Sequence, residues 1–179
     1  VFWLMMIMMV CSGASEQAVS QWASTFAEQG LGVSKTVGDL AGPLAFAALM
    51  GTSRLLYGKF GDKLNLNKCM PLRYFISMIA LIPVPAIGLI GCALCGFSVG
   101  VLWPGTFSKS SAAIKRGGTV MFAMLALAGD LGCSGGPTLA GLVSGNFNNN
   151  LHIGILSAII FPAIMLLCLL ISKYKLSKS

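Results

Sequence analysis

Residues 151–171 read LHIGILSAIIFPAIMLLCLLI, and Lys173, Lys175 and Lys178 come after them. A helix needs about 20 predominantly apolar residues to cross the hydrocarbon core of a bilayer, and this stretch meets that need. Further hydrophobic runs precede it at 1–28, 36–58, 69–83, 86–108 and 118–143. We therefore predict an all-α, polytopic membrane bundle with six transmembrane helices.

The composition excludes an ordinary soluble domain. Of the 179 residues, 56% are hydrophobic and only 9% are charged, whereas a soluble domain carries about 25% charged residues. The mean hydropathy is +0.84. The net charge of +7 does not indicate nucleic-acid binding, because the basic residues are scattered in short loops without a basic, aromatic stripe. The expected partner of this surface is the lipid bilayer.

The basic residues alternate between the ends of the predicted helices. All of them except Lys35 fall between the second and third runs or at the facing ends of those runs (Arg54 and Arg73), between the fourth and fifth runs, or after the sixth run. Such loops stay in the cytoplasm. We therefore expect a multi-pass protein of the cell membrane, with both ends of this segment cytoplasmic and a basic tail at 172–179. Trp103 is expected at the inner membrane interface.

Two pairs of glycines have the spacing that lets helix backbones approach closely in lipid. Gly96 and Gly100 lie in the fourth run, and Gly141 and Gly145 lie in the fifth. Both pairs predict tight contacts between helices.

The first run carries a polar stripe. At about 100° per residue its polar side chains fall on one side of the helix, while Ala18 and Trp22 fall on the other. The stripe consists of Glu16, Gln17, Ser20, Gln21, Ser24 and Glu28. Lipid cannot satisfy these groups, so the stripe predicts a cavity wall where Glu16, Gln17 and Gln21 bind a polar solute. The alternative is an amphipathic outer helix end near the membrane surface.

Two aspartates also lie within or beside hydrophobic runs. Asp130, in the fifth run, could bind substrate, carry a coupling proton, or pair with the helix backbone next to Pro137. Asp39 completes Thr36-Val-Gly-Asp39, which fits a variant capping box, so we expect it to cap the second helix.

One serine motif suggests a different activity. Gly132-Cys-Ser134-Gly135 resembles the motif of rhomboid intramembrane serine proteases, and His152 is the single histidine. Ser134 would lie roughly 13 Å below the surface at which His152 begins the sixth helix, whereas a serine and its base must come within about 3 Å. The chain has no phosphate-binding loop, H-E-x-x-H or dinucleotide fingerprint, so we expect no cofactor, no metal and no enzyme activity.

The loop after the second run resembles the cytoplasmic signature of the major facilitator superfamily, G-x-x-x-D-R/K-x-G-x-R/K-R/K. The chain reads Arg54-Leu-Leu-Tyr-Gly58-Lys59-Phe60-Gly61-Asp62-Lys63. Lys59, Gly61 and Lys63 match the signature. Arg54 and Gly58 stand where the signature has its first glycine and its aspartate. Leu64 replaces the last basic residue. The resemblance implies a gating signature made of Arg54, Gly58, Lys59, Gly61, Asp62 and Lys63, in the degenerate form typical of a C-terminal half.

The same resemblance implies a fold and an activity. Half of a major facilitator fold is a six-helix bundle built from two inverted three-helix repeats, and an N-terminal six-helix half, missing here, would complete the cavity. The stretch Gly13-Ala-Ser-Glu16-Gln17 through Trp22 also resembles the seventh helix of the fucose-permease-like branch. We therefore expect a secondary active transporter that moves a small polar solute such as a sugar by alternating access, in symport with a proton or sodium ion. A non-catalytic membrane scaffold is the remaining alternative.

Overall fold

The computed structural model describes residues 1–30, 32, 34–61, 85–115 and 117–176, and their regular structure is entirely helical. The elements are α1 (Phe2–Ser20), α2 (Ala23–Thr25), the π-helix η1 (Phe26–Gly30), α3 (Lys35–Phe60), α5 (Pro85–Val99), α6 (Leu102–Ala113), α7 (Gly118–Asn146), α8 (Leu151–Ser157) and α9 (Ile160–Leu176). The predicted helix at 69–83 lies outside the described residues. The predicted all-α class therefore agrees with the described part of the chain.

Four helical segments are long and apolar enough to cross a membrane among the described residues. They are Phe2–Glu28, Ile90–Ala113, Gly118–Asn146 and Leu151–Ser172. The helix α3 has 26 residues but is less apolar, because Lys35, Asp39, Arg54 and Lys59 lie along it. The structure thus shows a membrane helix bundle, while the predicted count of six spans remains a prediction.

Two of the long helices are interrupted where a proline follows. The helix of α5 and α6 breaks at Gly100 and Val101, four residues ahead of Pro104. The helix of α8 and α9 breaks at Ala158, four residues ahead of Pro162. Proline lacks an N–H and its ring clashes with the carbonyl group four residues earlier, which accounts for both breaks.

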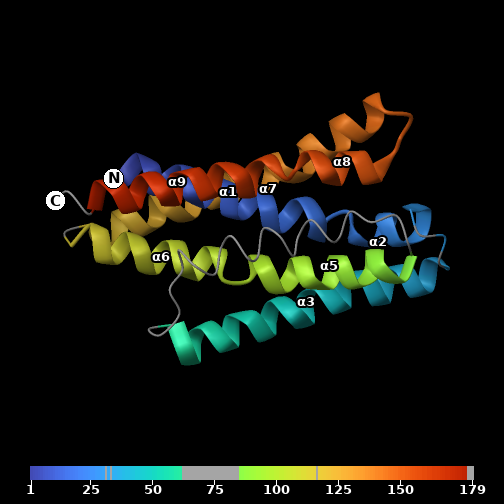
Figure 1. The fold of residues 1–179 in the computed structure, drawn as a ribbon, viewed down its shortest axis with the longest axis horizontal. Coiled ribbons are helices and arrows are strands. Elements are labelled where there is room, and N and C mark those ends of the chain that lie inside the picture. Colours follow the sequence, from blue (N-terminus) through green and yellow to red (C-terminus); the bar gives the residue numbers. More distant parts are fainter. Residues whose placement is uncertain (31, 33, 62–84, 116, 177–179) are drawn as a thin grey trace.

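Helices α1 and α7 run in one direction and α3, α5–α6 and α8–α9 run in the other, and α1 begins at the left-hand end of the bundle in Figure 1. The end of α3, the α6–α7 turn and the end of α9 lie at that end too. Lys59 is in the last turn of α3 and Lys115 is in the α6–α7 turn, whereas Lys35 begins α3 at the opposite end. The described basic residues are therefore gathered as the alternation predicts, and which side of the membrane they face remains a prediction.

Two helix pairs make the closest contacts, α1 with α7 and α3 with α5. A Cβ atom added at Gly132 or Gly136 of α7 would overlap the backbone oxygens of Val10 and Ala14 of α1. Such glycines let the two backbones touch, which is how helices associate in lipid. The α1–α7 contact is therefore made by the main chain.

The α3–α5 contact has the same design. An added Cβ atom at Gly96 would overlap the backbone of Phe46, and one at Gly100 would lie 2.7 Å from the backbone oxygen of Met50. The prediction of tight packing is thus confirmed for this pair. It is wrong for the pair in α7, because Gly141 faces the ring of Trp22 and the space beside Gly145 is open.

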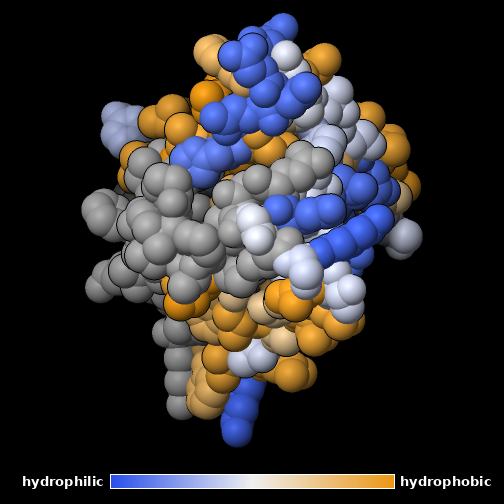
Figure 2. Space-filling model, turned by 90° about the vertical axis from the view of Figure 1, so that its right-hand side faces the viewer, coloured by the Kyte–Doolittle hydropathy of each residue, from blue (hydrophilic) through white to orange (hydrophobic). Residues whose placement is uncertain are grey.

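The interior is rich in flexible apolar side chains, and much of the side surface is apolar too. Met5, Met8 and Met9 of α1 are fully buried against Leu125 of α7 and Met165 of α9. Large apolar side chains remain exposed along α3, α7 and α9, among them Leu44, Leu127, Leu131, Leu142 and Leu167. Figure 2 views the end that carries the α7–α8 turn and shows hydrophilic residues gathered there with hydrophobic atoms around them. This distribution fits a bundle whose sides meet lipid.

Candidate functional site

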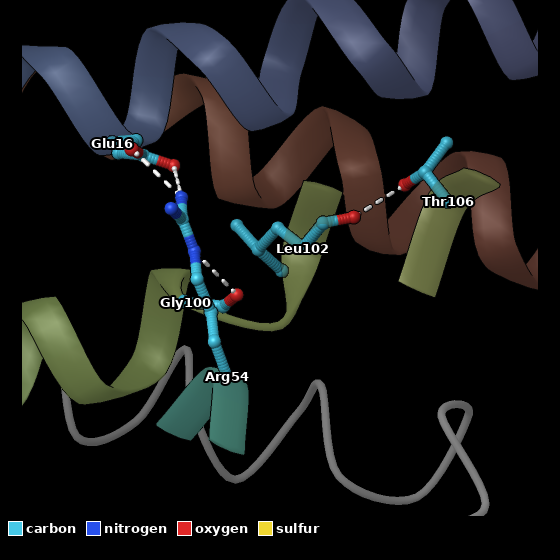
Figure 3. A network of polar contacts seen from close by, with 5 residues as sticks. All are labelled: Glu16, Arg54, Gly100, Leu102 and Thr106. Atoms are coloured by element: carbon cyan, nitrogen blue, oxygen red, sulfur yellow. Dashed lines mark hydrogen bonds and ion pairs between the residues drawn. The ribbon is translucent and has the colours of Figure 1, made fainter. Parts of the chain in front are cut away.

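Glu16 of α1 and Arg54 of α3 form an ion pair between the two helices. The Nη2 atom of Arg54 lies 3.0 Å from each carboxylate oxygen of Glu16, and Figure 3 shows the two side chains pointing toward one another. The Glu16 side chain is 12% exposed and that of Arg54 is 42% exposed. A charge in an apolar bundle is costly without a partner, and here each charge has one.

A helix break supplies Arg54 with a second acceptor. Because Pro104 has no N–H, the carbonyl oxygen of Gly100 lacks its helical donor. The Nε atom of Arg54 donates a hydrogen bond to that oxygen at 3.3 Å (Figure 3). The guanidinium group is therefore held by α1 on one side and by the α5–α6 break on the other.

Further hydroxyl groups surround this centre. The Thr106 hydroxyl, fully buried in α6, donates to the carbonyl oxygen of Leu102 at 2.7 Å (Figure 3). Ser12 lies one turn before Glu16 and Ser53 directly precedes Arg54, and both hydroxyls are buried without a hydrogen-bond partner in the described part of the chain. Unpaired buried hydroxyls are uncommon. Buried hydroxyl groups therefore accompany the ion pair on α1, α3 and α6.

A pocket of about 390 Å³ opens beside Arg54, between α3 and α6. Its walls are mainly aromatic and apolar, and they consist of Arg54, Tyr57, Gly58, Trp103, Pro104 and Phe107. The rings of Trp103 and Phe107 lie 6.0 Å apart, and the Phe107 ring lies 5.7 Å from that of Phe122. The arrangement places one guanidinium group at the edge of an aromatic surface.

A comparison with known families now places the chain. The family model for the Major Facilitator Superfamily matches residues 1–137. The chain belongs to the major facilitator superfamily. No curated protein and no solved structure matches it. As a major facilitator protein it is a multi-pass membrane transporter of small solutes, and members of this superfamily are not enzymes.

The superfamily signature predicted from the sequence is only partly visible. Gly58, Lys59 and Gly61 lie at the end of α3, where the Lys59 ammonium group is 5.5 Å from the centre of the Phe60 ring. Arg54 instead reaches into the bundle and pairs with Glu16. Asp62 and Lys63 lie outside the described residues. The structure thus joins one predicted signature residue to one predicted solute-binding residue.

The side chains of the polar stripe on the first helix are only partly buried. Gln17 and Ser20 are half-buried, Gln21 is exposed, and Ala18 on the other side is fully buried. The regular helix is interrupted at Gln21 and Trp22, between the end of α1 and the start of α2. Val19 and Trp22, on the predicted opposite face, are half-buried as well, so burial does not separate the two faces, and the role of the stripe as a cavity wall remains a prediction.

Asp39 does not have its predicted role, and Asp130 lies apart from the ion pair. The prediction that Asp39 caps α3 is wrong, because the N-cap Ser34 makes no side-chain cap and Asp39 accepts a hydrogen bond from the Ser24 hydroxyl of α2. Asp130 is exposed on α7, and no ion pair or hydrogen bond among the described residues joins it to Glu16 or Arg54. Its predicted contribution to substrate binding is therefore not linked to this centre.

Ser134 and His152, the two residues considered for a protease site, make contacts with other residues. The Ser134 hydroxyl donates to the carbonyl oxygen of Asp130 in its own helix at 3.3 Å. The ring of His152 stacks on Phe26, with the ring centres 6.3 Å apart. These contacts do not favour a serine nucleophile with a histidine base. Membership of a transporter superfamily also argues against the protease hypothesis.

Proposed function

We propose that this chain is the C-terminal half of a secondary active transporter that moves a small polar solute across the cell membrane by alternating access. The solute class suggested by the fucose-permease-like stretch is a sugar, with a proton or sodium ion as the coupled cation. An N-terminal six-helix half would complete the cavity. The basic ends of the helices, which lie together, would face the cytoplasm.

The pairing of the helices supports the inverted repeats. One repeat would contain α1, α3 and the predicted helix at 69–83, and the other would contain α5–α6, α7 and α8–α9. The first helix of one repeat then packs on the second helix of the other, in both directions, as α1 with α7 and α3 with α5. Two units related by a two-fold axis produce this reciprocal pairing. Glycines spaced by four residues lie at both contacts, Gly96 and Gly100 against α3 and Gly132 and Gly136 against α1.

The observation that carries the proposal is the ion pair of Glu16 and Arg54 at a break in a membrane helix. Ionisable residues inside membrane helices are costly, and they mark substrate and ion pathways in transporters. Broken helices with freed carbonyl groups also form such sites near the middle of the bilayer. Here the Gly100 carbonyl oxygen, Glu16 and Arg54 combine both features within one cluster.

Solute uptake by the full-length protein in membrane vesicles tests the proposal. We expect Glu16→Gln to reduce uptake at least tenfold, because the carboxylate that holds Arg54 is lost, and Gln21→Ala to reduce it several-fold. Asp39→Asn is a matched control, since Asp39 bonds Ser24 and not the central cluster. Unchanged uptake by both Glu16→Gln and Gln21→Ala would refute the assigned cavity wall.

A further inference from the structure

The pocket beside Arg54 has a chemical character that the transport proposal does not specify. Among the described residues that line it, Arg54 carries the one charged group, a guanidinium, and none is acidic. The remaining surface comes from the rings of Tyr57, Trp103 and Phe107 and from Pro104. A ligand in this pocket therefore meets hydrogen-bond donors at one edge and flat apolar surfaces elsewhere.

The Arg54 guanidinium group is held in place by hydrogen bonds, but these bonds do not use all of its N–H donors. Its Nε atom bonds the Gly100 carbonyl oxygen and its Nη2 atom bonds both oxygens of Glu16. The Nη1 atom has no hydrogen-bond partner among the described residues. Glu16 is nearly buried and is not one of the residues that line the pocket. The carboxylate thus orients the arginine while leaving N–H donors for a ligand.

We propose that this pocket binds the carboxylate group of a small organic acid with a flat apolar body. The proposal rests on the transport function argued above and names the solute class for this site. The Nη1 atom of Arg54, which has no partner among the described residues, can donate charge-assisted hydrogen bonds to a carboxylate. The aromatic walls match a planar body. A sugar fits less well, because its hydroxyl groups need acceptors and the described lining side chains offer one, the Tyr57 hydroxyl.

The size of the pocket agrees with this class. Its volume of about 390 Å³ lies at the small end of the roughly 300–1,000 Å³ found for small-molecule sites. One aromatic ring with one carboxylate group therefore suits the space. Benzoate is the simplest probe with these features, and benzyl alcohol is its uncharged counterpart.

Binding measurements on the full chain in lipid nanodiscs, with any chain that copurifies kept in place, test the charge. We expect saturable benzoate binding, with benzyl alcohol and D-galactose each binding at least tenfold more weakly. Arg54→Gln should weaken benzoate binding at least tenfold. Lys35→Gln, which removes a positive charge at the other end of α3, should leave benzoate binding within twofold of the parent.

A second pair of variants tests the location without touching the ion pair. An added Cβ atom at Gly58 meets no atom within 4 Å, and Gly58 lines the pocket, so Gly58→Leu should fill it. We expect at least a tenfold loss of benzoate affinity. Gly51→Leu is the matched control, because Gly51 is in the same helix, also faces open space and does not line the pocket.

The outcomes separate this inference from the transport proposal. Benzoate binding that survives both Arg54→Gln and Gly58→Leu, or the absence of saturable benzoate binding, would overturn the anion site. Galactose that binds as tightly as benzoate, with the same dependence on Arg54, would overturn the solute class while leaving transport intact. Benzoate that binds as expected in a protein that transports no solute would instead refute the transport proposal.

Discussion

Gly132 of α7 lies so close to the backbone oxygen of Val10 of α1 that a single added carbon atom would overlap it. One helical turn further along, Gly136 has the same relation to Ala14. The two helices are therefore held at a distance set by their main chains, and this contact fixes where Glu16 of α1 stands relative to the other helices.

Replacing Gly132 with alanine should destabilise the protein. The methyl group must push α1 and α7 apart, and overpacking of this kind costs about 1–3 kcal/mol. Gly135→Ala is the control, because its added Cβ meets only open space and alanine improves helix propensity by about 1 kcal/mol. Thermal unfolding in detergent, followed by circular dichroism, should rank the Gly132 variant below the parent. Equal stability of the two variants would contradict the close contact.

The indole group of Trp22 should contribute a measurable hydrogen bond. Its Nε1 atom donates to the carbonyl oxygen of Pro137 at 3.1 Å and thereby ties the turn before α2 to α7. Trp22→Phe keeps an aromatic ring but loses the donor, so we expect a loss of about 0.5–1.5 kcal/mol in unfolding free energy. Trp3→Phe, at a side chain that is 73% exposed, should have little effect. A Trp22 variant as stable as the Trp3 variant would show that the bond contributes nothing.

Pro104 should matter more for transport than for stability. Alanine at this position restores an N–H that competes with Arg54 for the Gly100 carbonyl oxygen. Pro104 lies in the first turn of α6, where proline is tolerated, so Pro104→Ala should change thermal stability little while lowering solute uptake. Pro43→Ala, which replaces the proline inside α3, should leave uptake unchanged. Equal uptake by both variants would mean that the bond from Arg54 to Gly100 has no role.

The ion pair of Glu16 and Arg54 should show strong coupling in a double-mutant cycle. Removing one partner strands the other charge, which costs about 3–5 kcal/mol for a fully buried pair. Because Arg54 is 42% exposed, we expect a smaller cost of about 1–3 kcal/mol for Glu16→Gln or Arg54→Gln alone. The double variant should lose clearly less than the two single losses combined. Additive losses in chemical unfolding experiments would indicate that the charges do not interact.

The positions of the helices could be predicted well from hydrophobicity alone. The runs predicted at 36–58 and 118–143 correspond to α3 and α7, each extended by a few residues. The interruptions were not predicted, because a proline in a hydrophobic run can either bend a helix or break it. Pro43 and Pro137 lie within continuous helices, whereas the helix breaks four residues ahead of Pro104. Tertiary contacts decide between the two outcomes.

Half of the candidate site could be predicted. Glu16 was identified because an acidic group is costly at that depth, and this reasoning needs only local sequence. Its partner Arg54 lies near the end of a hydrophobic run, where an arginine also serves as a topology signal, so it was assigned to the loop. The contact between α1 and α3 is a long-range feature that no periodicity in one sequence encodes.

The aromatic side of the site was missed for a related reason. Trp103 was expected at the membrane interface, where tryptophan is common, but the structure places it next to the helix break with its ring against Gly129. Glycine spacing likewise predicts that a helix has a smooth face, but it does not predict which element packs against that face. Gly96 therefore meets α3 as expected, whereas the space beside Gly145 is open.

The main-chain contacts at Gly96, Gly132 and Gly136 have a consequence for how this protein tolerates sequence change. In a water-soluble domain, the large side chains of the interior are usually the positions at which selection permits least variation. In this chain any amino-acid substitution at these glycines adds atoms where none fit, whereas Leu127 and Leu142 on the outer surface can be exchanged for other apolar residues. A saturation library selected for surface expression should therefore be depleted more strongly at Gly96, Gly132 and Gly136 than at Gly135 or Gly145, where added atoms meet open space.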